Sequence, residues 1–177
     1  MLKFLQGFWE IARFRSGPES LPASVFLAQL TFAAYIGIQL PLLFIQTGAG
    51  MRPLVSGFAD ALVLTAFTWT LLRLTGKSSR FIQTVTALYG TGVIISLVAF
   101  PVGALVLGSG SGNVPLLAAL ALLGILIWSV LVAGHIFSRA ISRTMVEGVV
   151  ISLVYFVLNY QIIQMLLNFG QSAAQTG

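Results

Sequence analysis

Residues 81–108 read FIQTVTALYGTGVIISLVAFPVGALVLG and contain no Asp, Glu, Lys or Arg. This stretch is longer than the roughly 20 apolar residues that a helix needs to cross a bilayer core about 30 Å thick. It therefore predicts a membrane-spanning α-helix, and it decides the fold class of the chain around it.

Four further apolar segments flank this one, at about 23–46, 54–75, 114–138 and 145–168. The whole chain is 58% hydrophobic and 7% charged, whereas soluble domains are roughly 25% charged. Its mean hydropathy is +1.00. We therefore expect an all-α membrane protein with a bundle of five transmembrane helices over residues 23–168.

The first 22 residues differ from the rest of the chain. Apolar and charged residues alternate at helical spacing over residues 1–15, and Ser16-Gly17-Pro18-Glu19-Ser20-Leu21-Pro22 should end that helix. We expect residues 1–22 to form an N-terminal amphipathic segment at the membrane interface. A helix packed against the other helices is an equal alternative.

The distribution of basic residues predicts the orientation. Eight of the nine Lys and Arg residues fall on one side of a five-span topology; only Arg52 falls on the other. The positive-inside rule then places the N-terminus in the cytoplasm and the C-terminus, with a short tail over residues 169–177, outside. An even number of spans would destroy this pattern.

Small residues predict how the spans pack. Gly92, Ser96, Ala99 and Gly103 form a stripe on one face of the third span, and such stripes allow helix backbones to approach closely in lipid. We expect this span to be central in the bundle. Pro41 and Pro101 should bend the first and third spans.

Asp60 is the acidic residue that falls within the second span, and ionisable groups inside a membrane are costly. The fifth span carries amide side chains at similar depth, and the first span adds one more: Gln161, Gln164, Asn168 and Gln39. We expect these to converge on Asp60. The cluster is either a site for protons or small solutes, or a set of hydrogen bonds that fixes packing.

A second polar group is expected near the other membrane surface. His135 and Arg139 lie near the inner end of the fourth span, and Glu147 begins the fifth. The three can share one network, in which a histidine would suit a pH sensor or proton relay. The alternative is a hydrogen-bonded histidine of structural importance only. Asp60 lies too far away to pair with it.

The remaining composition argues against catalysis. The chain has no cysteine, one histidine and four carboxylates, too few for the common metal, nucleophile or acid–base sites. We expect neither an enzyme nor a cofactor or metal. Nucleic acid is not expected as a partner, because the basic residues cluster at span ends, where they set topology and meet anionic lipid.

Several short motifs are similar to those of a known family. They are Tyr89-Gly90-Thr91, Ala99-Phe100-Pro101, Trp128 and Phe137-Ser138-Arg139-Ala140. With the five closely spaced spans, the chain over roughly 24–168 resembles the Yip-type integral membrane family. Eukaryotic members interact with Rab-type GTPases, but the long N-terminal region typical of them is missing here. The resemblance therefore implies a bacterial-type relative in the inner membrane.

Three functions follow as hypotheses. The first is a non-enzymatic scaffold or accessory subunit that binds other membrane proteins or itself. The second is a small transporter, channel or proton-linked component that uses Asp60 and the polar face of the fifth span. The third is a lipid-binding or membrane-shaping protein that uses the basic N-terminal helix. Membrane lipids are expected partners in every case.

Overall fold

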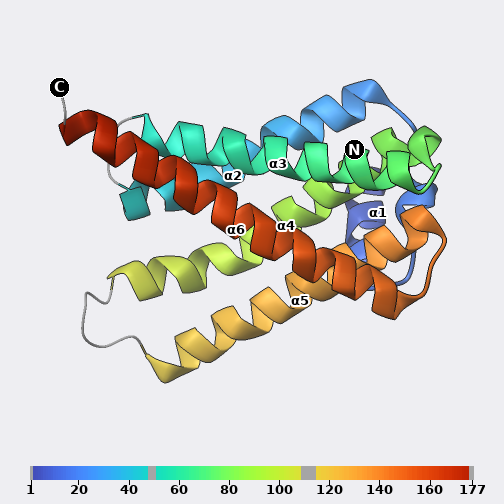
Figure 1. Cartoon of the computed structure of the whole chain (residues 1–177). Helices are drawn as coiled ribbons and strands as arrows, with labels where there is room; N and C mark the ends of the chain where they lie inside the picture. Colours follow the sequence, from blue (N-terminus) through green and yellow to red (C-terminus); the bar gives the residue numbers. More distant parts are fainter. Residues whose placement is uncertain (1, 48–50, 109–114, 176–177) are drawn as a thin grey trace.

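The computed structural model describes residues 2–47, 51–108 and 115–175, and within these ranges the chain is all helical (Figure 1). Six α-helices and two short 3-10 helices follow in the order α1 (Leu2–Ala12), η1 (Pro18–Ser20), α2 (Val25–Thr47), α3 (Arg52–Leu74), η2 (Ser78–Arg80), α4 (Phe81–Gly108), α5 (Leu116–Ile141) and α6 (Met145–Gln175).

Helices α2 to α6 are long and apolar enough to cross a membrane, so the predicted all-α fold with five spans is confirmed. Most helix ends lie within two residues of the prediction, and two differ by three residues or more. Helix α5 continues to Ile141, where Ser142 takes a left-handed conformation with φ 56°. Helix α6 continues to Gln175, well beyond the apolar stretch that ends at Leu166, because no proline follows to stop it. Residues 48–50 and 109–114, which connect α2 to α3 and α4 to α5, lie outside the described residues.

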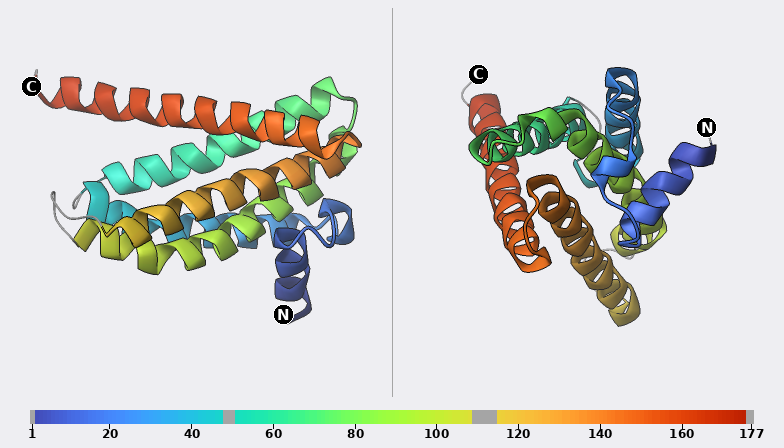
Figure 2. Two further views of the ribbon diagram at one scale, coloured as in Figure 1. Left: turned by 90° about the horizontal axis from the view of Figure 1, so that it is seen from below. Right: turned by 90° about the vertical axis from the view of Figure 1, so that its right-hand side faces the viewer.

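The basic connections gather at one end of the bundle. Helix α1 and the connections that carry Lys77, Arg80 and Arg143 lie at the end opposite the C-terminus (Figures 1 and 2). We call this the basic end. Helix α1 crosses it at a steep angle to the spans (Figure 2, left).

Helix α1 is packed into the bundle as well as placed at its end. Its buried side chains include Phe8 and Ile11, and the Phe8 ring lies against Gly90 of α4, where no Cβ would fit. The Trp128 Nε1–H donates to the Ala12 carbonyl at 3.0 Å. The apolar face of α1 is therefore packed against the spans, as one of the two alternatives for this segment expects.

Helix α4 is central, as expected, because it contacts α1, α2, α3 and α5. Its small-residue stripe packs against α2: a Cβ on Gly92 would lie 2.5 Å from the Tyr35 ring, and a Cβ on Gly103 would lie 3.3 Å from Leu42. The stripe is thus an internal contact between two spans.

Helices α5 and α6 approach each other backbone to backbone, a contact that the sequence did not predict. A Cβ on Gly134 would lie 2.8 Å from the Val149 Cα, and a Cβ on Gly148 would collide with the Gly134 carbonyl. Beside this contact, the Ser152 hydroxyl donates to the Val130 carbonyl across the interface at 2.9 Å. The two glycines lie near the basic end, on either side of the 142–144 connection.

Away from the basic end the helices diverge. Helix α6 separates from α5 toward the end that carries the C-terminus (Figures 1 and 2), whereas α2 stays packed on α4, with Leu42 against Gly103. Pro41 and Pro101 lie inside α2 and α4, in this half of the molecule. The bundle is therefore closed by tight packing at one end and spread at the other.

The α5–α6 contact predicts that a residue larger than glycine at position 148 destabilises the protein. Replacing Gly148→Ala should force the two backbones apart and lower the free energy of unfolding by about 1–3 kcal/mol, the usual cost of overpacking. Thermal unfolding of the purified protein in mild detergent measures the change. Gly124→Ala on α5 is the matched control, because its Cβ meets nothing within 4 Å. Equal stability of the two variants would contradict the close contact.

Candidate functional site

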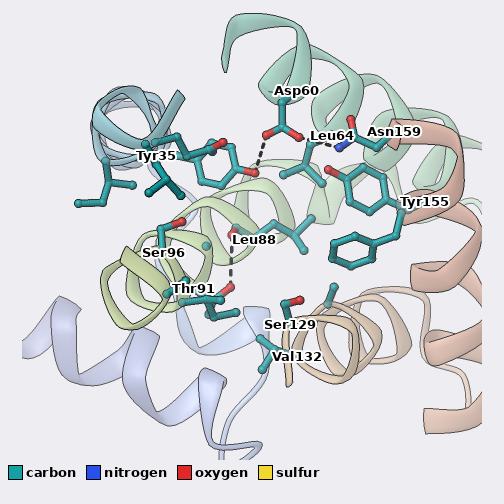
Figure 3. Close-up of a pocket in the computed structure, with 18 of the residues that line it drawn as sticks. Tyr35, Asp60, Leu64, Leu88, Thr91, Ser96, Ser129, Val132, Tyr155 and Asn159 are labelled. Carbon is teal, nitrogen blue, oxygen red and sulfur yellow. Dashed lines mark hydrogen bonds between the residues drawn. The ribbon is translucent and has the colours of Figure 1, made fainter. Parts of the chain in front are cut away.

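A cavity of about 340 Å³ lies where the spans begin to diverge, and all five spans contribute to its wall (Figure 3). Most of the wall is apolar. Its main polar side chains come from α2, α3, α4 and α6: Tyr35, Gln39, Asp60, Ser96, Tyr155 and Asn159.

Asp60 is the charged group of this cavity. The Tyr35 hydroxyl donates to Asp60 Oδ2 at 2.7 Å, and the Asn159 side-chain amide donates to Asp60 Oδ1 at 2.7 Å (Figure 3). Each carboxylate oxygen thus accepts one hydrogen bond from a neutral donor. Eight residues separate Asp60 from the start of α3, a rise of about 12 Å, which places it within the apolar layer.

No cation compensates the carboxylate within the described part of the chain. The one ion pair found there joins Arg143 and Glu147 at the basic end. An unpaired charge in a low-dielectric region retains a strong attraction for cations, because neutral hydrogen bonds satisfy its lone pairs only in part.

Aromatic packing holds the donors in place. The Tyr35 ring lies against the Tyr89 ring with centroids 5.1 Å apart and against Gly92. The Tyr89 hydroxyl reaches α3, where it donates to the Ala61 carbonyl at 2.9 Å and shares a short hydrogen bond with Thr65. Tyr155 packs on Phe67 of α3 with centroids 5.4 Å apart. The carboxylate therefore sits in a rigid frame.

Two further polar atoms at the cavity wall lack a hydrogen bond of standard geometry among the described protein atoms, although the Gln39 side chain interacts with that of Tyr35. These are the amide nitrogen of Gln39 and the amide oxygen of Asn159. Buried polar groups are costly when unpaired. Together with Asp60, they present one donor, one acceptor and a negative charge to a molecule in the cavity.

The structure brings together part of the predicted cluster. Gln39 and Asp60 line the same cavity, but Gln161, Gln164 and Asn168 are exposed and do not line it. The expected convergence of the fifth-span amides on Asp60 is therefore wrong. Gln161 follows Asn159 by two residues, which places it on nearly the opposite face of α6.

The sequence prediction did not assign Tyr35, Tyr155 or Asn159 to the site; it treated the tyrosines as interface anchors or core packing rather than as a ligand site. Tyr155 and Asn159 are spaced four apart, so they share one face of α6. The spacing shows that the two side chains belong together, but it does not show which face of α6 points inward, because Gln161 and Gln164 share another face in the same way.

The predicted group at the basic end is also only partly assembled. His135 and Arg139 line one hollow, and His135 Nε2 lies 2.9 Å from the Ser16 carbonyl, with the ring edge-on to Phe14. Glu147 lies elsewhere: its carboxylate accepts a hydrogen bond from the Thr144 backbone N–H at 3.3 Å and caps α6.

Among the described residues, no three His, Cys, Asp or Glu side chains gather as a metal site would require. No known protein family, characterised protein or solved structure matches this chain. The site must be interpreted from its own geometry, and the Yip-type resemblance stays a prediction.

The hydrogen bonds to Asp60 predict a measurable coupling. In a double-mutant cycle of Tyr35→Phe and Asp60→Asn, the two changes should be non-additive by about 0.5–3 kcal/mol, as for residues in direct contact. Unfolding of the four proteins in the same detergent measures the coupling. A parallel cycle with Tyr160→Phe serves as control, because Tyr160 is exposed on α6. Additive effects in the Tyr35 cycle would contradict the hydrogen bond.

Proposed function

We propose that this chain is a non-enzymatic membrane protein that binds and moves a small cationic solute through the cavity at Asp60. The observation that carries the proposal is the intramembrane carboxylate at a cavity walled by all five spans, with neutral hydrogen-bond donors as its only described partners. Ionisable groups at such depth typically mark ion or solute pathways.

The wall suggests the class of solute. A volume of about 340 Å³ falls at the lower end of the roughly 300–1,000 Å³ found for ligand sites, so the solute is small. Asp60 favours a positive charge, while the apolar remainder of the wall favours a compact organic group. A small alkylammonium ion meets both demands, and an acceptor group on it would pair with the Gln39 amide.

The orientation belongs to the same proposal. With the basic end in the cytoplasm, the spread half of the bundle faces outward, and the solute reaches Asp60 from that side. We place the protein in a bacterial inner membrane, on the strength of the family resemblance. A reporter fused after Gly177 would then be active outside the cytoplasm.

Reconstitution into liposomes tests the proposal. We expect wild-type protein to accelerate uptake of radiolabelled methylammonium or choline, and Asp60→Asn to reduce this flux at least about tenfold, the effect of losing 1.4 kcal/mol of binding. Glu10→Gln is the matched control, because it neutralises an exposed carboxylate on α1. Absence of flux for both probes with wild-type protein, or equal loss in both variants, would contradict the proposal.

A second candidate is the scaffold or accessory subunit. The stripe of Gly92, Ser96, Ala99 and Gly103 supports it less than expected, since the two glycines pack against α2. What favours it is the exposure of Gln161 and Gln164 on α6, among exposed apolar side chains. Amide side chains on the lipid-facing side of a span can hydrogen-bond to a neighbouring helix.

This candidate has its own test. If a second helix covers this face, Gln161→Leu combined with Gln164→Leu should abolish self-association or partner capture in mild detergent, since model helices gain about 1–2 kcal/mol from such bonds. Cross-linking followed by mass analysis gives the readout. Leu158→Ala combined with Met165→Ala trims exposed neighbours and leaves both amides. Unchanged association in the glutamine variant would show that the Gln161 and Gln164 face of α6 is not the contact surface.

The third hypothesis, lipid binding through the apolar face of the N-terminal helix, has less support. Phe8, Ile11 and Ala12 are buried inside the bundle. Among residues 5–22, whose burial the structure describes, Leu5, Trp9 and Phe14 are the exposed large apolar residues, and they can anchor the segment in the interface.

A further inference from the structure

The basic end carries a hollow of about 740 Å³ that is separate from the Asp60 cavity. Residues from the N-terminal segment, η2, the end of α5 and the start of α6 line it, among them Phe14, Glu19, Arg80, His135, Arg139 and Arg143. Ser138 lines it too, and both His135 and Ser138 are buried. Four separate stretches of chain thus build one site.

The charge of the hollow is positive. Three guanidinium groups and the single carboxylate of Glu19 line it, and a second carboxylate, that of Glu147, lies 3.9 Å from Arg143, so the arginines still outnumber the carboxylates. Arginine presents planar donors that match a phosphate group in pairs, and such charge-assisted bonds are among the strongest in proteins.

Arg80 is fixed, whereas the other two arginines are available. Nη1 of Arg80 donates to the carbonyls of Arg139 and Ala140 at 3.1 Å and to the Ser142 hydroxyl at 2.9 Å, which holds the end of α5. Among the described residues, the Arg143 guanidinium pairs with Glu147 at 3.9 Å, and both side chains are exposed; such surface pairs contribute little. Arg139 is exposed as well.

Aromatic residues place the hollow at the level of lipid headgroups. At the basic end, Arg73 lies 5.0 Å from the centre of the Trp69 ring, and Arg13 lies 6.0 Å from that of Trp9. Exposed tryptophan beside arginine is typical of the membrane–water interface. Next to the hollow, Val146 is 73% exposed at the start of α6, where an acyl chain would run.

We propose that this hollow binds the phosphate group of an anionic phospholipid, with Arg139 and Arg143 as its mobile clamp and Arg80 as its fixed wall. Basic pockets between helices on the cytoplasmic side bind such headgroups in other membrane proteins. Free phosphate shares the chemistry, and the experiment separates the two sources. The inference does not depend on the Asp60 cavity.

Thermal unfolding of the full chain in neutral detergent gives the test, since a ligand that binds the folded state raises the transition temperature. Phosphatidylglycerol, phosphatidylcholine and inorganic phosphate are titrated separately. We expect phosphatidylglycerol to stabilise the protein and phosphatidylcholine to have no effect. Arg139→Gln combined with Arg143→Gln should weaken the apparent affinity at least about tenfold.

The matched control is Arg73→Gln combined with Lys77→Gln, which removes the same charge at the same end outside the hollow. Affinity within about threefold of wild type in this control, with loss in the arginine pair, supports the site. Stabilisation by inorganic phosphate with the same arginine dependence supports the phosphate site and assigns free phosphate as its source. Equal losses in both pairs, or no stabilisation by any anion, would overturn it. Single variants Arg139→Gln and Arg143→Gln replace the pair if it does not fold.

Discussion

The bundle depends on the few points at which helix backbones touch. Lipid offers no hydrophobic drive for helices to associate, so close packing must supply the attraction. Here Gly134 and Gly148 let α5 and α6 meet backbone to backbone, and Gly92 admits the Tyr35 ring between α2 and α4. The α5–α6 contact lies near the basic end. The other half of the molecule is consequently free to diverge, and the cavity is the space that this divergence leaves.

The carboxylate in that space is a costly element. Insertion of an aspartate at the centre of a span costs roughly 2.5–3.5 kcal/mol, and two neutral hydrogen bonds at 2.7 Å recover only part of it. An asparagine would accept and donate there without the charge. A cationic ligand offers the missing compensation, and this energetic mismatch favours a binding role over a packing role for Asp60.

Hydropathy identified the spans because a helix surrounded by lipid must be apolar and long enough to cross the bilayer core, and both properties can be read from the sequence. It could not identify the faces of the spans. A helix that is apolar on all sides carries no pattern that says which residues point inward, so Gln161 was assigned to the site and Asn159 was missed. The Gly134–Gly148 contact was missed for a related reason: its partners lie on different helices, and only the geometry of the α5–α6 connection aligns them. Asp60 was identified because an ionisable residue inside an apolar span stands out in the sequence, whichever face of the helix it lies on.

The two sites share one structural element, and this has a thermodynamic consequence. Helix α5 contributes Val132 and Ala133 to the cavity wall and, within two further turns, His135 and Arg139 to the hollow. Between them, Gly134 is in backbone contact with α6, so this part of α5 is packed closely on its neighbour. Any rearrangement that opens the cavity by moving α5 therefore also changes the hollow. If both proposed sites are occupied, a headgroup that prefers one arrangement of α5 would shift the cavity by its difference in affinity for the two arrangements, and a solute at Asp60 would shift the affinity for the headgroup by the same factor.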